Sequence, residues 1–140
     1  MSELTLTLPL PPKELSPNHR SRSHWPRTRA TKRYRAIACD LALIAARQRN
    51  DLPWGRVRVQ PTFYFAEERG RDGDNFNTAL KPAIDALQRD RSTARAAKPG
   101  AHIVVNDKHV TLLPPVFEVD KLNPRVELRI TQLESEADHE

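Results

Sequence analysis

The sequence contains a single cysteine, only four glycines and no long apolar run among its 140 residues. One thiol, Cys39, excludes an intrachain disulfide and is typical of proteins from a reducing compartment. No stretch approaches the roughly 20 apolar residues of a membrane span, and the first residues show no signal-peptide pattern. We therefore expect a cytoplasmic protein without a membrane partner. Four glycines leave no glycine-rich phosphate loop, and we expect no small-molecule cofactor.

Several common catalytic and metal-binding patterns are also missing. One cysteine and scattered histidines do not supply the closely spaced ligands of a zinc site. An EF-hand loop is excluded because Phe76 stands where the third oxygen ligand belongs. No serine or cysteine shows a local signature of a nucleophile paired with histidine. His109 is interpreted as a surface histidine of a strand rather than a general base.

Positive charge is in excess, and its distribution is uneven. The chain has 23 Lys and Arg against 18 Asp and Glu, and four of the acids lie in the last eight residues, 133–140, which hold no Lys or Arg. A basic body of this kind favours a polyanionic partner such as nucleic acid. We interpret residues 1–133 as one domain and residues 134–140 as an acidic, disordered tail.

Cations gather in a segment from His19 to Arg35 that contains no acid and that includes Trp25 and Tyr34. Basic side chains neutralise phosphates, and aromatic rings can stack on unpaired bases. The alternative is a solvated arm whose Trp25 packs on the core. We favour contact with DNA, and the residues assigned to it are Asn18, His19, Arg20, Arg22, Arg27, Arg29, Lys32 and Arg33.

The first half of the chain reads as strand, loop, helix and strand. Apolar residues alternate from Leu4 to Leu10 and again from Val57 to Phe65, where Pro61 indicates an edge strand or a bulge. Residues 13–30 are predicted to be a loop, and residues 31–49 a helix. The core face of that helix is predicted to comprise Tyr34, Ile37, Ala38, Leu41, Ile44 and Ala45.

The second half begins with a helical period that contains Pro82, which would cost ~3 kcal/mol in a helix interior. We therefore predict a looser turn over 76–80 and a regular helix from Lys81, with Pro82 in its first turn. A basic, flexible connection, 89–100, follows. A strand is predicted over 102–106, with a hairpin partner over 109–113 that extends through 116–119. A last strand is predicted over 126–130. The order β-α-β-α-β-β-β predicts an α+β fold, a mixed sheet carrying two helices.

Three acids fall where a strand ends or a turn begins, at Asp72, Asp74 and Asp107. Oxygen ligands suit Mg²⁺, and Mn²⁺ is plausible as well. Lys81 would add a positive charge beside a bound phosphate. Ordinary alternatives exist: these acids are also typical turn residues, and Lys81 can simply pair with Asp85 one turn later. We favour a functional Lys81, with Asp85 as its orienting partner or a neighbour of the metal ligands.

The chain resembles the RusA-type Holliday junction resolvases, which are common in prophages. The resemblance covers most of residues 4–132. It rests on Pro11-Pro12 followed by Asn18-His19, on Asp72-Gly73-Asp74-Asn75, on Lys81 with Asp85 and Leu87, and on Asn106-Asp107. Three features depart from the family. Lys81 follows Asp74 by seven residues rather than the more familiar four, Asn106 replaces an acid, and the link from Asp85 to Asp107 is longer and basic.

The resemblance implies a homodimeric, Mg²⁺-dependent endonuclease of DNA recombination and repair that resolves four-way junctions by paired nicks. It implies that Asp72, Asp74 and Asp107 hold the metal, that Lys81 assists at the scissile phosphate, and that Asn75 shapes the metal turn. Two rival functions stay open. One is a branched-DNA-binding module without catalysis, and the other is a nuclease for flaps or forks.

Overall fold

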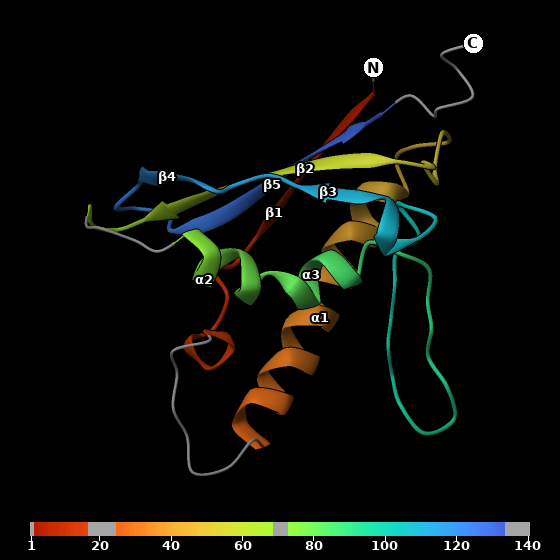
Figure 1. Ribbon diagram of the computed structural model, residues 1–140, viewed down its shortest axis with the longest axis horizontal. Coiled ribbons are helices and arrows are strands. Elements are labelled where there is room, and N and C mark those ends of the chain that lie inside the picture. Colours follow the sequence, from red (N-terminus) through yellow and green to blue (C-terminus); the bar gives the residue numbers. More distant parts are fainter. Residues whose placement is uncertain (1, 17–24, 69–72, 134–140) are drawn as a thin grey trace.

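A five-stranded mixed sheet organises the chain (Figure 1). The computed structural model describes residues 2–16, 25–68 and 73–133, without the side chains of Asp74 and Asp107. The sheet order is β1-β5-β2-β3, and β4 also pairs with β2. The strands are β1 (Glu3–Leu8), β2 (Val57–Phe65), β3 (Val110–Leu112), β4 (Val116–Val119) and β5 (Arg125–Gln132). Strand β5 is antiparallel to β1 and β2, whereas β3 and β4 are parallel to β2. The prediction of an α+β fold with a mixed sheet is confirmed.

The predicted strand over 102–106 is wrong, and so is its hairpin. This segment packs against the end of the second helical region, where the Ala101 N–H donates to the Ala86 carbonyl (2.8 Å) and the Ile103 N–H to the Leu87 carbonyl (2.7 Å). Among the described residues, its pairing of the β type is limited to the isolated parallel bridge Trp54–Val104, in which the Trp54 N–H donates to the Ile103 carbonyl (2.8 Å). Both Ile103 and Val104 are fully buried. The apolar run is therefore a core plug, which residue pattern alone does not distinguish from a buried strand.

Pro61 lies in the central strand, so the expectation of an edge strand or a bulge is wrong. The Val59 carbonyl accepts a hydrogen bond from the Leu113 N–H (2.9 Å), which shows that odd-numbered residues of β2 direct their backbone polar groups toward β3 and β4. Strand β3 ends opposite Val59 and β4 begins opposite Thr62. The missing N–H of Pro61 thus falls in the gap between two short strands, where no ladder bond is needed.

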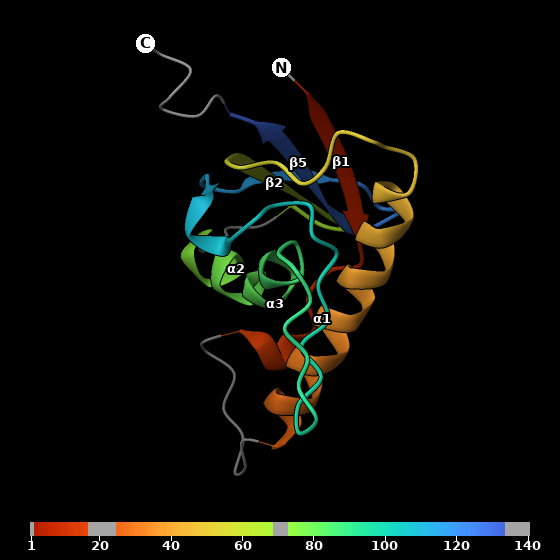
Figure 2. The same ribbon diagram turned by 90° about the vertical axis from the view of Figure 1, so that its right-hand side faces the viewer.

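In the described part of the chain, three α-helices lie on one face of the sheet (Figure 2). They are α1 (Trp25–Ala46), α2 (Gly73–Ala79) and α3 (Lys81–Asp85), and two 3₁₀ turns accompany them, η1 (Lys13–Leu15) and η2 (Asp107–His109). Helix α1 begins six residues before the predicted start, because Pro26 occupies a first-turn position that tolerates its missing N–H. The placement of Pro82 in the first turn of α3 is confirmed, but the looser turn before it is the helix α2.

The core lies between the sheet and the helices. Leu6, Val59 and Leu128 from the sheet are buried there, and Tyr34, Ala38 and Ala42 meet them from α1. Ile37 and Ile44, which we assigned to this face, are 36% and 54% exposed, so that part of the prediction is wrong. Small alanines face the sheet and bring α1 close to it, while the branched residues lie on the outer face. None of the described helices is long and apolar enough to cross a membrane.

Candidate metal and nucleic-acid site

Helices α2 and α3 form an almost continuous helical path that carries Asp74, Lys81 and Asp85. Leu80, between the helices, keeps helical torsions (φ −80°, ψ −9°), and its carbonyl accepts from the Ile84 N–H at 3.0 Å. A helix turns once in about 3.6 residues, so positions 74, 78, 81 and 85 share one stripe. The seven-residue step from Asp74 to Lys81 is thus two helical turns.

A pocket of about 590 Å³ lies between this helical path and strand β3. Its lining residues are Asn77, Thr78, Lys81, Ile84 and Asp85 from the helices, with Val110 and Leu112 from β3. Lys81 and Asp85 also line a second pocket of about 320 Å³, which they share with Arg27 and Arg35 of α1. Lys81 is exposed, whereas Ala83 and Ile84 beside it are buried and hold the helix against the core.

The predicted metal ligands lie on separate segments of the chain. Asp74 is the second residue of α2, and Asp107 opens η2, three residues before the pocket-lining Val110. Figure 1 shows η2 beside the end of α3, with the start of α2 at the opposite end of the helical path. Asp72 lies outside the described residues, as do the side chains of Asp74 and Asp107. Helix α2 thus leads from Asp74 into this pocket, whereas the described side chains of η2, Lys108 and His109, line a separate pocket with Arg56 and Thr111.

Four phenylalanines fix the start of α2 against the sheet. Phe76 packs on Phe63 and Phe65, each with a ring-centroid distance of 5.2 Å, and on Phe117 at 5.5 Å. Phe63 and Phe65 belong to β2, which precedes α2. Phe117 belongs to β4, which follows much later in the sequence. Because Phe76 follows Asp74 and Asn75 directly, the cluster fixes the backbone on which the predicted metal turn is built. Asn75 is half-buried there.

Asn77 is a pocket residue that we did not single out from the sequence. Its Nδ2 donates to the Leu113 carbonyl (3.0 Å), which ties α2 to the segment between β3 and β4. Its Oδ1 is buried and has no hydrogen-bond partner among the described residues. An acceptor of this kind is costly unless something satisfies it. The only sequence feature that could have pointed to Asn77 is its position three residues after Asp74.

Comparisons with known proteins assign no family to this chain. No protein-family model matches it, and no curated protein matches it significantly.

The described side chains alone do not form a metal site. Within residues 2–16, 25–68 and 73–133, no group of three or more His, Cys, Asp or Glu side chains is suitably placed to hold an ion. Lys81 and Asp85 share both pockets, but no ion pair joins them in the described part of the chain. Arg35 contacts this end of α3 instead: its Nη2 donates to the Asp85 carbonyl (3.4 Å) and its Nε to the Pro99 carbonyl (3.0 Å).

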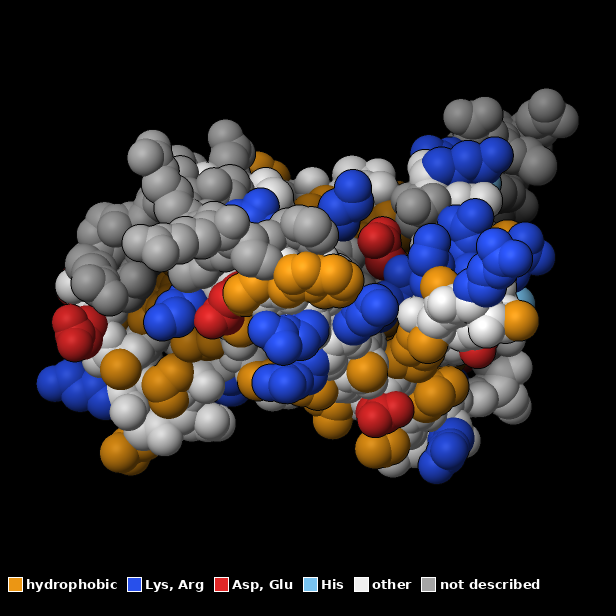
Figure 3. Space-filling view, turned by 90° about the horizontal axis from the view of Figure 1, so that it is seen from below, with side chains coloured by type: hydrophobic (Ala, Val, Ile, Leu, Met, Phe, Trp, Pro, Cys, Tyr) orange, Lys and Arg blue, Asp and Glu red, His pale blue; other side chains and the backbone are white. Residues whose placement is uncertain are grey.

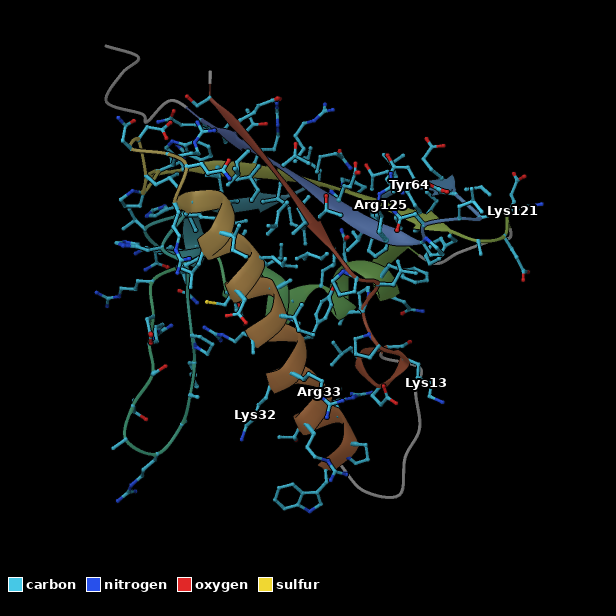
Figure 4. The ribbon with its side chains drawn as sticks, turned by 180° about the vertical axis from the view of Figure 1, so that it is seen from behind. Lys13, Lys32, Arg33, Tyr64, Lys121 and Arg125 are labelled. Atoms are coloured by element: carbon cyan, nitrogen blue, oxygen red, sulfur yellow. The ribbon has the colours of Figure 1, made fainter. Side chains whose placement is uncertain are left out.

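The predicted DNA-contact residues that the structure describes lie on α1, not on a loop. Arg27, Arg29, Lys32 and Arg33 are all exposed in its first turns, whereas Asn18, His19, Arg20 and Arg22 lie outside the described residues. Arg27 also donates to the carbonyls of Glu14 (3.1 Å) and Ser16 (2.9 Å). Figure 4 shows Lys32 and Arg33 leaving α1 on opposite sides, with Arg33 on the side of η1. The helix therefore presents cations in more than one direction.

The two aromatic residues of the basic segment have different roles. Trp25 is 62% exposed, so it is not a core residue. Tyr34 is 2% exposed, and its hydroxyl donates to the Pro9 carbonyl at 2.7 Å. Burial raises the pKa of Tyr34 far above its ordinary value. Cys39 is buried as well, and burial, followed by the charges of Asp40 and Asp90, raises its thiol pKa. Of the two rings, only Trp25 is available for stacking on a base.

Proposed function

We propose that the protein is a magnesium-dependent endonuclease whose substrate is branched DNA, four-way junctions above all, as in the RusA-type resolvases that its motifs resemble. The observation that supports this most is the pocket between the α2–α3 path and β3. It gathers Lys81 and Asp85, and helix α2, which carries Asp74, contributes Asn77 and Thr78 to its lining. Helix α1, which carries exposed cations, lies on the same side of the sheet (Figure 2).

The donor atoms around the pocket fit a hard cation such as Mg²⁺ or Mn²⁺. Carboxylates and amide oxygens are the ligands that these ions prefer, and the buried Oδ1 of Asn77 is one such oxygen without a partner among the described residues. Asp72 and Asp74, at the start of the helical path, would hold the ion, and Asp107, whose segment lies near the other end of that path, would join them only if η2 approaches the start of α2. When bound, it would activate a water and offset negative charge on the phosphate.

The chain's own residues would position the DNA strand. Lys81, exposed at the mouth of both pockets, would hold a fixed positive charge against the scissile phosphate, where negative charge develops during hydrolysis. Asp85 lies one turn further along the same helical path. The cations of α1 would neutralise neighbouring phosphates without reading the base sequence.

A homodimer is part of this proposal, because a four-way junction presents two equivalent strands. Two active sites related by a two-fold axis would nick both strands at symmetric positions. The substrate would then be chosen by its shape rather than by its sequence.

Cleavage of a labelled four-way junction, with and without Mg²⁺, tests the proposal. We expect metal-dependent paired nicks from the wild type. The Asp74→Asn variant should cut at least about a hundredfold more slowly, as does removal of a preorganised electrostatic group elsewhere, yet still bind the junction. The matched control is Asp40→Asn, which removes an exposed carboxylate from the outer face of α1 and should cut like the wild type.

Other outcomes would redirect the assignment. Tight binding without any product in Mg²⁺ or Mn²⁺ would indicate a non-catalytic module for branched DNA. Faster cleavage of flaps or forks than of four-way junctions would change the substrate. Wild-type rates in the Asp74→Asn variant would show that this acid does not hold the metal, and wild-type rates in Asp107→Asn would exclude Asp107 in the same way.

A further inference from the structure

A basic hairpin projects from the helical layer beside α1. Residues 89–100 leave α3, run away from the sheet and return to the core plug at Ala101 (Figure 1). The Arg91 N–H donates to the Lys98 carbonyl (3.0 Å), and the Thr93 N–H to the Ala96 carbonyl (2.8 Å). These two backbone hydrogen bonds join the outgoing and returning arms of the connection that we expected to be flexible. Short hydroxyl and carboxylate bonds reinforce it, among them the Ser92 N–H to Asp90 Oδ1 bond at 2.7 Å.

The base of the hairpin is fixed to the body at three places. Arg89 and Ala101 form an antiparallel bridge, and the His102 N–H donates to the Gln88 carbonyl (3.0 Å). The Nε of Arg35, from α1, holds the Pro99 carbonyl at 3.0 Å. Gly100 packs so closely that an added Cβ would overlap the backbone carbonyls of Gln88 and Arg89. These contacts with the rest of the domain therefore fix the position of the hairpin base and the direction in which the hairpin projects.

The hairpin carries four exposed cations and one acid. Arg89, Arg91, Arg95 and Lys98 are exposed, and none of them forms an ion pair among the described residues. The acid, Asp90, accepts from Ser92, which lowers the pKa of its carboxyl and keeps it charged. The hairpin therefore retains a net charge of three positive units, from four cations and one acid. On the face seen from below, Lys and Arg side chains cover more of the surface than Asp and Glu side chains (Figure 3).

We infer that this hairpin is a second phosphate-binding arm, which holds the backbone of a DNA duplex together with the N-terminal half of α1. The inference rests on the proposed function, and it assigns to the hairpin a contact that the catalytic pocket does not need. The body fixes the direction of the hairpin, and Lys32 leaves α1 on the hairpin side in Figure 4. Cations from two separate elements would thus face one polyanion.

The chemistry of the hairpin favours a nucleic-acid backbone over a protein partner. Apart from the four cations, Asp90 and the closing Pro99-Gly100, its residues are small or hydroxylated, namely Ser92, Thr93, Ala94, Ala96 and Ala97. Protein interfaces are centred on buried aromatic and large apolar residues, and the hairpin offers none. Arginine and lysine heads with hydroxyl donors are the side chains that contact phosphate oxygens in DNA complexes. Such contacts would not depend on base sequence.

A charge-matched comparison tests the inference. One variant replaces Arg91, Arg95 and Lys98 by alanine. Its control replaces Arg58, Arg129 and Lys121 by alanine, which removes the same two guanidinium groups and one ammonium group from exposed positions elsewhere. Both full-length variants would be titrated with a labelled four-way junction without Mg²⁺, over a series of salt concentrations. Far-ultraviolet circular dichroism and thermal melting would check their folding.

We expect the hairpin variant to bind at least about tenfold more weakly than its control and to show a weaker dependence on salt. Each lost phosphate contact should reduce the slope of log K against log salt by about 0.9, so three should reduce it by about 2.7. Equal losses in the two variants would reduce the effect to net charge and overturn the inference. So would wild-type binding in the hairpin variant, even if the protein cleaves junctions as proposed.

A second variant separates the position of the hairpin from its charge. Gly100→Ala keeps every cation but pushes the hairpin base away from Gln88 and Arg89. We expect junction binding to weaken at unchanged net charge, while the Mg²⁺ concentration for half-maximal cleavage stays as in the wild type. Binding as tight as that of the wild type, with the fold intact by circular dichroism, would show that the direction of the hairpin is irrelevant. If the wild type bound no DNA at all, that result would refute the proposed function itself.

Discussion

Arg49, three residues after the end of α1, contacts Asp51, Glu3 and Trp54. Its Nε and Nη2 donate to the two carboxylate oxygens of Asp51, both at 2.9 Å, and its Nη1 donates to the Glu3 carbonyl at 2.8 Å. Its guanidinium carbon lies 5.1 Å from the ring centre of Trp54, which is 1% exposed. The Nε1 of Trp54 in turn donates to Asp51 (3.3 Å). This cluster connects α1 to the first strand and to the loop before β2.

The Asp51 carboxyl should make the stability of the protein depend on acid pH. The hydrogen bonds from Arg49 lower the pKa of Asp51 from 3.8 to about 2. A depressed pKa stabilises the folded state above pH 3.8, and this contribution is lost as pH falls toward 2. The free energy of unfolding, measured by urea denaturation, should therefore exceed that of Asp51→Asn by a constant amount above pH 5. The difference should shrink between pH 4 and 2, and a difference that stays constant to pH 2 would contradict the prediction.

Lys81 should matter for the chemical step more than for binding. We expect Lys81→Met to reduce single-turnover cleavage of a four-way junction by about a hundredfold, because a preorganised charge at the reacting phosphate is lost. Junction affinity should fall only slightly, and added Mg²⁺ should not restore the rate. Lys121→Met removes an exposed lysine at the far end of the sheet and serves as the control (Figure 4). Equal rates in the two variants would remove Lys81 from the mechanism.

At the scale of elements, the sequence predicts local structure better than contacts between distant segments. The place of Pro82 in the first turn of α3 follows from the missing N–H of proline, a property of one residue. The helix before it was missed because its stability comes from Phe76 packing on β2 and β4. The segment 102–106 was misassigned for the same reason, since its hydrogen bonds go to Leu87, Gln88 and Trp54.

The phenylalanine cluster should support both the stability and the activity of the protein. Phe76→Ala removes a half-buried ring that contacts Phe63, Phe65 and Phe117. We expect the free energy of unfolding to fall by roughly 3 kcal/mol, near the lower end of the range for core Phe→Ala changes. Cleavage should fall too, because the start of α2 loses its anchor. Phe76→Leu should restore most of the stability, as urea denaturation would show. A loss below 1 kcal/mol in Phe76→Ala would contradict the anchoring role.

At the scale of the whole molecule, the candidate site was only partly predictable. The spacing of Asp74, Lys81 and Asp85 follows from helix geometry, and it already indicates a shared stripe. The pocket itself does not follow from spacing, because Val110 and Leu112 reach it only through the parallel pairing of β3 with β2. Asn77 was missed because its role depends on the Leu113 carbonyl, 36 residues away. It stays a prediction that the carboxylates of Asp72, Asp74 and Asp107 bind one metal ion.

The proposed paired nicks require two copies of the chain. We expect a homodimer at micromolar concentration, with a mass twice the 16.0 kDa of one chain, by light scattering coupled to gel filtration. Addition of a four-way junction should give a complex of one dimer per junction, because its two equivalent strands suit a two-fold arrangement. A strictly monomeric protein that nicks only one strand per encounter would contradict this part of the proposal.

The position of Pro61 divides the outer side of the sheet into two short units. Strand β3 pairs with β2 over Val57–Val59, and β4 pairs with it over Thr62–Phe65, so no continuous ladder joins them. Short ladders can open locally without global unfolding. We expect amide hydrogen exchange to be faster in β3 than in the central strand, and to be independent of exchange in β4. Since η2 leads directly into β3, such fraying would release the Asp107 segment while the phenylalanine cluster beside β4 stays closed.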